Sequence, residues 1–255
     1  MRALAFFLAM SLRSRARRIA GLAGFGLMFL IAGAAARALT TGEHGHVELE
    51  RLFEIGGTTL VSALLLLGWL IGRFPIIATL VLVSGVFSDD RAAGHARLYA
   101  VRPRSLVVLY GARMVLYAAI AFLMSAMLMP GFDLLILGDW TGGGVFALIA
   151  AQIMVYGSIT ALLSAVTRGD AWIALFLGIV AIVWDALRRM DFLQTAPPAL
   201  REIVSMLLPP QGALMRVEGA FGAAQPVPWE AVLYISLYAA LVLILAGVAL
   251  SRREL

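Results

Sequence analysis

Residues 88–113 read SDDRAAGHARLYAVRPRSLVVLYGAR and form the longest strongly polar interval between two long apolar runs of the chain. The interval is rich in arginine, with Arg91, Arg97, Arg102 and Arg104 inside it. Arginine and lysine accumulate in the cytoplasmic loops of membrane proteins. The interval therefore predicts a cytoplasmic loop that joins two membrane-spanning helices.

The amino-acid composition is typical of an integral membrane protein. Of the 255 residues, 62% are hydrophobic and 14% are charged, whereas a soluble domain carries about 25% charged residues. We expect a single transmembrane domain over residues 1–255, almost entirely embedded in the bilayer. The net charge of +5 sits mostly in the loops of one side, which indicates membrane orientation and not nucleic-acid binding.

The chain contains neither cysteine nor lysine. Without cysteine it forms no disulfide and has no thiolate chemistry. A P-loop needs a lysine to reach the nucleotide phosphates, and a Schiff base with a cofactor also needs one. The chain therefore cannot carry a standard Walker A site, and any ATP hydrolysis has to come from another polypeptide.

The apolar runs predict an all-α integral membrane protein with six transmembrane helices and an N-terminal interfacial amphipathic helix on the cytoplasmic side. The amphipathic helix is expected over residues 1–18, where a frayed basic terminus is the alternative. The spans are expected at residues 19–39, 57–87, 106–129, 145–166, 171–187 and 229–250. If the run 57–87 were split at Arg73-Phe74-Pro75, each half would be too short to cross the membrane alone, because a span needs about 20 residues. We therefore expect one long, tilted helix that is kinked by Pro75.

The connections between the spans differ in polarity. Residues 88–105 form the cytoplasmic loop, and residues 130–144 are expected to form a short outer loop. Residues 188–228 are too polar to cross the membrane. Within them, the stretches 200–208 and 212–221 have helical apolar spacing, which predicts two short helices that rest on or dip into the outer surface.

The distribution of arginine predicts the orientation. The expected inner segments contain twelve arginines: Arg2, Arg13, Arg15, Arg17, Arg18, Arg91, Arg97, Arg102, Arg104, Arg168, Arg252 and Arg253. The expected outer segments contain six: Arg37, Arg51, Arg188, Arg189, Arg201 and Arg216. This excess predicts that both termini lie in the cytoplasm.

Arg73 is expected near the middle of the bilayer, where a charged side chain costs on the order of 3 kcal/mol or more. It should face protein or water, and we regard it as a candidate for the substrate path. An arginine satisfied by nearby carbonyl groups or by a neighbouring copy of the chain is the alternative.

Glu43, His44 and His46 are of the types that bind metal ions. Two histidines two positions apart do not share a helix face, and no further ligand pattern is present. We therefore expect a solvated loop and no metal site.

The central loop resembles that of type-2 ABC exporter permeases, the membrane subunits of ATP-binding-cassette transporters. In that family the loop reads acid-Arg-acid-x-Gly-Thr-Leu-Glu, then Arg-Pro-Val-Ser-Arg, then Gly-Lys. This chain matches it at Asp90-Arg91, Gly94, Arg102-Pro103-x-Ser105 and Gly111. The chain departs from the family pattern at Ala92, His95, Arg97, Leu106 and Ala112. The order of spans, the Leu208-Pro209-Pro210-Gln211 element and the Arg-Arg-x-Leu tail also resemble the family.

The resemblance implies a non-catalytic permease subunit of an exporter in the bacterial inner membrane. It implies two copies of the membrane chain and two copies of a separate cassette ATPase, with ATP and Mg bound by the ATPase and no cofactor bound by this chain. The ATPase would dock on Asp90, Arg91, Gly94, Arg97 and Arg102, and Pro103 would fix the exit of the loop. The substrate path would lie between the two copies, lined by the first, second and fifth spans.

Two other functions stay open. A secondary transporter often has broken helices, and Gly72-Arg73-Phe74-Pro75 is the candidate break here. A membrane enzyme acting on lipids would need a nucleophile or a metal set, and neither His-x-x-x-His nor Gly-x-Ser-x-Gly occurs in the sequence. The substrate of an exporter is not indicated by any motif.

Overall fold

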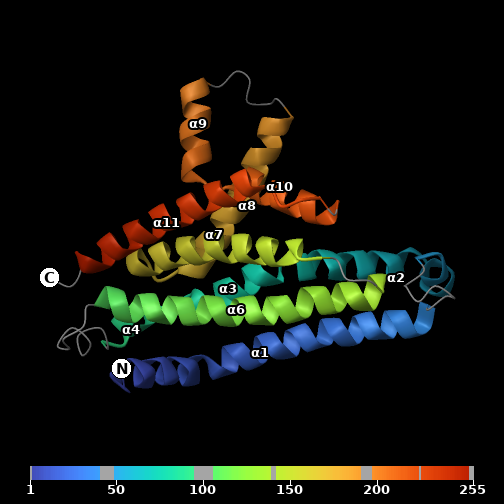
Figure 1. The fold of residues 1–255 in the computed structure, drawn as a ribbon, viewed down its shortest axis with the longest axis horizontal. Helices are drawn as coiled ribbons and strands as arrows, with labels where there is room; N and C mark the ends of the chain where they lie inside the picture. Colours follow the sequence, from blue (N-terminus) through green and yellow to red (C-terminus); the bar gives the residue numbers. More distant parts are fainter. Residues whose placement is uncertain are drawn as a thin grey trace.

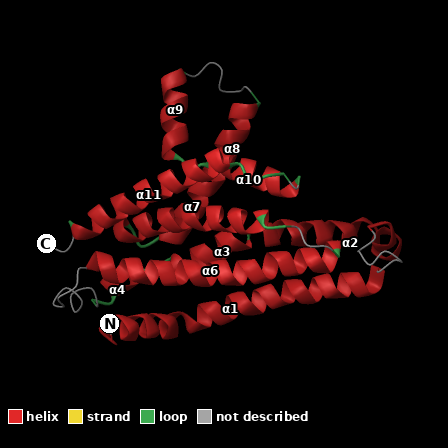
Figure 2. Ribbon diagram, in the orientation of Figure 1, coloured by secondary structure: helices red, strands yellow, loops and turns green. Residues whose placement is uncertain are grey.

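The computed structural model describes residues 2–40, 49–94, 106–138, 142–190, 197–223 and 225–252. Every regular element in these ranges is a helix (Figure 2), which confirms the all-α class. The helices are α1 (Arg2–Thr40), α2 (Leu49–Gly72), α3 (Phe74–Val83), α4 (Ser88–Ala92), α6 (Leu106–Leu137), α7 (Gly144–Val166), α8 (Asp170–Arg189), α9 (Pro198–Leu207), α10 (Gln211–Gly222) and α11 (Trp229–Ser251).

Among the described residues, α1, α6, α7, α8 and α11 are each long and apolar enough to cross a membrane. The bent pair α2 and α3 adds a sixth candidate if the two helices form one span. The chain is therefore a multi-pass membrane protein. The start of α1 and the end of α11 lie at the same end of the bundle as α4 (Figure 1), and we call this the α4 end.

Helix α7 forms the centre of the bundle. Of its most apolar window, 72% is buried, against 22% for both α1 and α8. Its polar side chains were expected to bond between helices, and Gln152 does so. Ser158 and Thr160 instead donate to carbonyl oxygens of their own helix, at Val155 and Tyr156. A hydroxyl bonded in this way lets a polar residue sit on the central helix without a partner from another one.

Helix α1 runs without a break across the boundary expected between an interfacial helix and the first span. No proline or glycine lies between residues 10 and 20, so nothing in the sequence interrupts the helix there. Ser11 and Arg15 face the bundle, with 1% and 6% of their surface exposed. The basic segment therefore continues the first span and packs as part of it.

The expectation that the third span ends at Met129 is wrong, because α6 continues through Pro130 to Leu137. Phe132 is 4% exposed, and its ring lies 3.2 Å from where a Cβ on Gly33 of α1 would stand. Packing against α1 thus holds the helix together beyond the proline. Membrane helices tolerate an interior proline when neighbouring elements compensate for the lost hydrogen bond.

The expected single kinked helix over residues 57–87 is broken in two. Helices α2 and α3 meet at Arg73 with a bend of 49°. Pro75 lies in the first turn of α3, where a missing N–H group does little harm. A second irregularity falls at Gly57, whose φ of 59° lies in the left-handed region that glycine adopts easily.

The two short helices expected in the segment 188–228 correspond to α9 and α10, which begin and end within two residues of the expected positions. Helix α10 packs against α7, α8 and α11. Helix α9 has no buried residue and projects away from the other helices (Figure 1).

Candidate functional site

The predicted cytoplasmic loop begins in the structure with α4, a helix of five residues directly after α3. A turn over residues 84–87 joins the two helices. Gly85 in this turn has a φ of 72°, and Gly94 after α4 has a φ of 75°. Because positive φ favours glycine, these two glycines let the chain turn into and out of α4.

The entrance to α4 is fixed by hydrogen bonds from its backbone N–H groups to side chains of α7 and α8. The N–H of Gly85 donates to the carboxylate of Asp170 at 2.6 Å. The N–H groups of Phe87 and Ser88 both donate to the hydroxyl of Ser164, at 3.1 and 3.2 Å. The first N–H groups of a helix have no partner inside it, so these side chains fasten the start of α4 to two neighbouring helices.

Asp90 is held by α6. Its carboxylate lies 2.8 Å from Nη1 of Arg113 and accepts a hydrogen bond from the hydroxyl of Tyr110 at 3.1 Å. Arg113 also donates to the hydroxyl of Ser11 on α1 and to the carbonyl of Val86. The side chains of Arg113 and Asp90 are only 9% and 14% exposed. Removing one partner of so buried a pair costs about 3–5 kcal/mol, because the other charge is left unpaired.

Asp89 is held by α1. Its carboxylate pairs with Arg15 at 3.1 Å and with Arg18 at 3.7 Å. Arg18 also donates to the carbonyl groups of Val81 and Ser84 at the end of α3. The side chain of Asp89 is 58% exposed, whereas that of Arg15 is 7% exposed, so water screens this pair only from the side of the carboxylate.

Arg91 reaches the end of α7. Its Nη1 donates to the carbonyl oxygen of Ala165 at 3.1 Å, and its Nη2 lies 3.5 Å from that of Thr167. The last carbonyl groups of a helix lack intrahelical partners, and a cation beside them also complements the helix dipole. Arg91 therefore caps α7 from α4.

We call this cluster of charged residues the polar junction: Arg15, Asp89, Asp90, Arg91 and Arg113. Together with the hydrogen bonds of the preceding turn, it ties α4 to α1, α6, α7 and α8. α4 is thereby in contact with four helices at once.

Of the residues predicted to dock a partner, Asp90 and Arg91 lie in the polar junction, and Gly94 follows α4. The carboxylate of Asp90 and the guanidinium of Arg91 bond within the chain. Arg97, Arg102 and Pro103 lie outside the described residues, as do Glu43, His44 and His46.

Sequence reasoning missed the partner of Asp90. Arg113 points into the bundle and is 7% exposed. The available signal was the spacing of Tyr110 and Arg113, which places both side chains on one face of a helix. No local pattern indicates that this face meets α4.

Arg73 forms an ion pair within the chain. Its Nη1 lies 2.8 Å from the carboxylate of Glu218 on α10, and the two side chains are 22% and 37% exposed. This outcome matches neither expected alternative, since the partner is neither a carbonyl group nor another copy. Whether Arg73 also meets a substrate stays a prediction.

The break beside Arg73 is also contacted by α7. The amide nitrogen of Gln152 donates to the carbonyl of Gly72 at 3.1 Å, a group that the broken helix leaves without a partner. The amide oxygen of Gln152 is buried and has no hydrogen-bond partner among the described residues. The break is thus supported from α7 and from α10.

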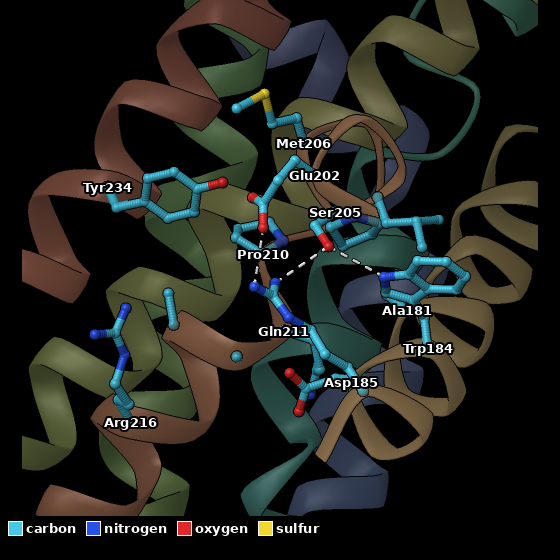
Figure 3. A pocket seen from close by; sticks show the side chains of 15 residues that line it. Ala181, Trp184, Asp185, Glu202, Ser205, Met206, Pro210, Gln211, Arg216 and Tyr234 are labelled. Carbon is cyan, nitrogen blue, oxygen red and sulfur yellow. Dashed lines mark hydrogen bonds and ion pairs between the residues drawn. The ribbon is translucent and has the colours of Figure 1, made fainter. Parts of the chain in front are cut away.

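Two cavities lie at opposite ends of the described structure. The inner cavity, of about 440 Å³, is lined by Arg18 of α1, by Leu80 and Val81 of α3, and by Trp172 and Leu175 of α8, among others. The outer cavity, of about 420 Å³, lies between α8, α9, α10 and α11 (Figure 3). The lining of the inner cavity comes from the second and fifth expected spans and from Arg18, the last residue of the expected interfacial helix. The names inner and outer follow the orientation predicted from the sequence.

No protein-family model, curated protein or solved structure matches the chain. The function is therefore argued from the geometry of the polar junction and of the cavities.

Proposed function

We propose that the chain is the transmembrane permease subunit of an ABC-type exporter in a bacterial inner membrane. In this proposal the chain crosses the bilayer six times, with both termini in the cytoplasm, and works as two copies with two copies of a separate cassette ATPase. The observation that carries the proposal is the polar junction, which ties a short helix after a spanning pair to four other helices.

The polar junction supports a role in mechanical coupling. Packed helices move as rigid units, so small shifts at one site become larger rearrangements elsewhere. A partner that moves α4 acts through Asp90 on α6, through Arg91 on α7, and through the turn at Gly85 on α8. The same movement reaches α3 directly and, at its far end, the pair of Arg73 with Glu218.

Within this proposal, Asp90 and Arg91 position the docking loop, and the residues from Gly94 onward make the contact with the ATPase. Arg97 and Arg102 supply charge for that contact, and Pro103 fixes the direction in which the chain leaves it. ATP and Mg bind to the partner, in keeping with a chain that has no lysine for a P-loop.

The inner cavity supports a substrate path between two copies. An exposed stripe of large apolar side chains on α8 continues from it at helical spacing: Trp172, Phe176, Ile179 and Val183. In the proposed dimer these stripes face each other across the path.

Docking is tested by co-expressing the chain with candidate cassette ATPases and measuring co-purification. Glu substitutions of Arg97 and Arg102 should abolish co-purification and leave the thermal stability of the chain unchanged. Asp90→Ala should lower stability as well, because it breaks the polar junction. Full co-purification and export with both arginines reversed would count against the docking role.

The dimer is tested with a single cysteine in place of Phe176. The chain has no native cysteine, so any disulfide-linked dimer must join two introduced thiols. We expect cross-linking in membranes at this position and not at Val115, an exposed position on α6. Equal cross-linking at both positions would indicate random collision.

One observation favours a secondary transporter as a second candidate. Transporters of that class often bind substrate where spanning helices are interrupted, and α2 and α3 are interrupted at Arg73 beside the unpartnered amide oxygen of Gln152. Reconstitution of the chain alone separates the two functions. Uptake or export driven by an ion gradient, without any ATPase, would favour the secondary transporter.

A further inference from the structure

We propose that the outer cavity binds a zwitterionic headgroup in which a phosphodiester carries an ammonium group, as in phosphatidylethanolamine. This inference goes beyond the proposed export function and depends only on the chain being a membrane protein.

The outer cavity is large enough for such a group and is built from four helices. Its volume is about 420 Å³. Arg216 and Tyr234 lie on one side of it in Figure 3, and Trp184 and Asp185 lie on the other. The cavity therefore offers polar groups from opposite walls.

Gln211 is the feature that points to a ligand. The residue lies at the start of α10, lines the cavity and is 6% exposed. Its amide oxygen is buried and has no hydrogen-bond partner among the described residues. Leaving a buried acceptor unsatisfied costs about 1–3 kcal/mol, so a ligand that donates a hydrogen bond here would gain by satisfying it.

The remaining lining supplies both signs of charge. Arg216 is exposed and forms no ion pair with another described residue, which leaves its guanidinium open to an anionic group such as a phosphodiester. Glu202 lies 3.2 Å from Arg188, and this pair is exposed enough to exchange partners with a zwitterion. The ammonium group is then shared between Glu202 and the amide oxygen of Gln211.

The other charged groups of the wall are already held in place. Asp185 pairs with Arg189 at 2.8 Å, and its carboxylate lies against Gly212 in the first turn of α10. The hydroxyl of Ser205 accepts from Trp184 at 3.1 Å and lies 3.3 Å from Nη1 of Arg188. These contacts fix the wall around the open Arg216.

An exposed apolar face of α9 adjoins the cavity. Met206 lines the cavity, and the α9 side chains of Leu200, Ile203 and Leu207 are also at least half exposed. A polar pocket that opens beside an apolar helix face suits an amphiphile, whose headgroup enters while its acyl chains lie along the helix. This favours a lipid over a soluble zwitterion.

Binding is measured by native mass spectrometry of the purified chain in detergent, titrated with four probes. The probes are phosphatidylethanolamine, phosphatidylglycerol, diacylglycerol and soluble glycerophosphoethanolamine. Phosphatidylethanolamine should bind at least about tenfold tighter than phosphatidylglycerol and diacylglycerol, the factor expected for one hydrogen bond to a charged group. Equal binding of phosphatidylglycerol would overturn the zwitterion assignment. If glycerophosphoethanolamine competes at equal concentration, the cavity still recognises the zwitterionic headgroup, but its ligand is a soluble compound and not a lipid.

Two variants test the residues. Arg216→Met should weaken phosphatidylethanolamine binding about tenfold, whereas Arg201→Met, an arginine of α9 outside the lining, should not. Gln211→Leu should weaken binding and also raise the melting temperature, because it removes an unsatisfied buried acceptor. A purely structural glutamine gives the opposite change in melting temperature. Unchanged affinity in both Arg216→Met and Gln211→Leu would overturn the proposal.

Discussion

The two ends of the molecule are built in opposite ways. At the α4 end, the carboxylates and guanidinium groups of the polar junction find partners inside the chain, although Nη1 of Arg15 is buried without a partner among the described residues, and Asp90 and Arg113 are almost fully enclosed. At the other end, α9 buries no residue and Arg216 stands open beside the outer cavity. The charged groups at the α4 end are mostly enclosed and paired, as in a protein interior. The other end has the exposed groups of a surface that binds a ligand or a partner.

The two ends are therefore suited to different functions, the α4 end to mechanical coupling and the other end to ligand binding. A closed polar network transmits force, because its members hold one another in a single arrangement. The wall of the outer cavity, with the unsatisfied amide oxygen of Gln211, is suited to binding, because a ligand can supply the hydrogen-bond donor that the described part of the chain does not. Substitutions at the α4 end should therefore act first on stability, and substitutions at the outer end should act first on binding.

The largest effect is expected at the pair of Asp90 and Arg113. Either Asp90→Ala or Arg113→Met should destabilise the chain by about 3–5 kcal/mol, because a buried charge loses its partner. Reversible unfolding in detergent measures the change. The double variant should lose less than the sum of the two single losses, since no unpaired charge remains.

Asp89→Asn is the matched control, one residue away. The side chain of Asp89 is 58% exposed and that of Arg15 is 7% exposed. Water screens the carboxylate side of this pair, so we expect a smaller loss than at Asp90. Equal losses at the two aspartates would contradict the contrast between an enclosed pair and a half-exposed pair.

The next largest effect is expected at the break between α2 and α3. Arg73→Met should cost about 2 kcal/mol, less than the pair in the polar junction, because Glu218 is 37% exposed and water relieves part of its charge. The melting temperature in detergent and export in proteoliposomes should both be measured. Glu230→Gln, at an exposed position in the first turn of α11, serves as the control and should change neither.

A smaller effect is expected in the turn before α4. Gly85→Ala places a side chain at a φ of 72°, which costs about 1–2 kcal/mol, and its Cβ would collide with the carboxylate of Asp89. Gly94→Ala is the matched control for Gly85→Ala, because Gly94 has a similar φ of 75° but open space around it. The difference between the two melting temperatures measures the collision alone, and no difference would show that Asp89 moves aside freely.

The smallest effect on stability is expected on α9. Leu207 is 75% exposed, so Leu207→Ser should change the stability of the single chain by about 0.5 kcal/mol or less. Leu214→Ser on α10, where the side chain is 3% exposed, should cost several times as much. A large loss at Leu207 in the isolated chain would mean that α9 is already covered.

The apolar runs were enough to predict the helices, because length and composition alone decide which segments can cross a bilayer. They were not enough to predict helix ends that depend on packing. Pro130 was read as a stop signal, and Phe132 packed against Gly33 overrides it. The arginines near residue 15 were read as an interfacial segment, and the helix simply continues.

The ion pairs could not be predicted, for a different reason. Arg73 and Glu218 are 145 positions apart, and Arg113 and Asp90 are 23 apart across a loop. Their pairing depends on how helices are arranged, which periodicity does not encode. The sequence did identify Arg73 as an unusual position, because a charge within a span demands a partner, whereas Asp90 was singled out by the resemblance of its loop to a known family.

The length of α1 has a consequence for where the polar junction stands. Thirty-nine residues at about 1.5 Å each make a rod of about 58 Å, nearly twice the hydrocarbon thickness of about 30 Å. Even a steep tilt leaves one end of α1 outside the hydrocarbon core of the bilayer, and the arginines at residues 13–18 identify that end. In the proposed orientation, Arg15 and Asp89 therefore stand beyond the lipid tails, and the 58% exposed side chain of Asp89 would be open to the proposed ATPase without its entering the membrane.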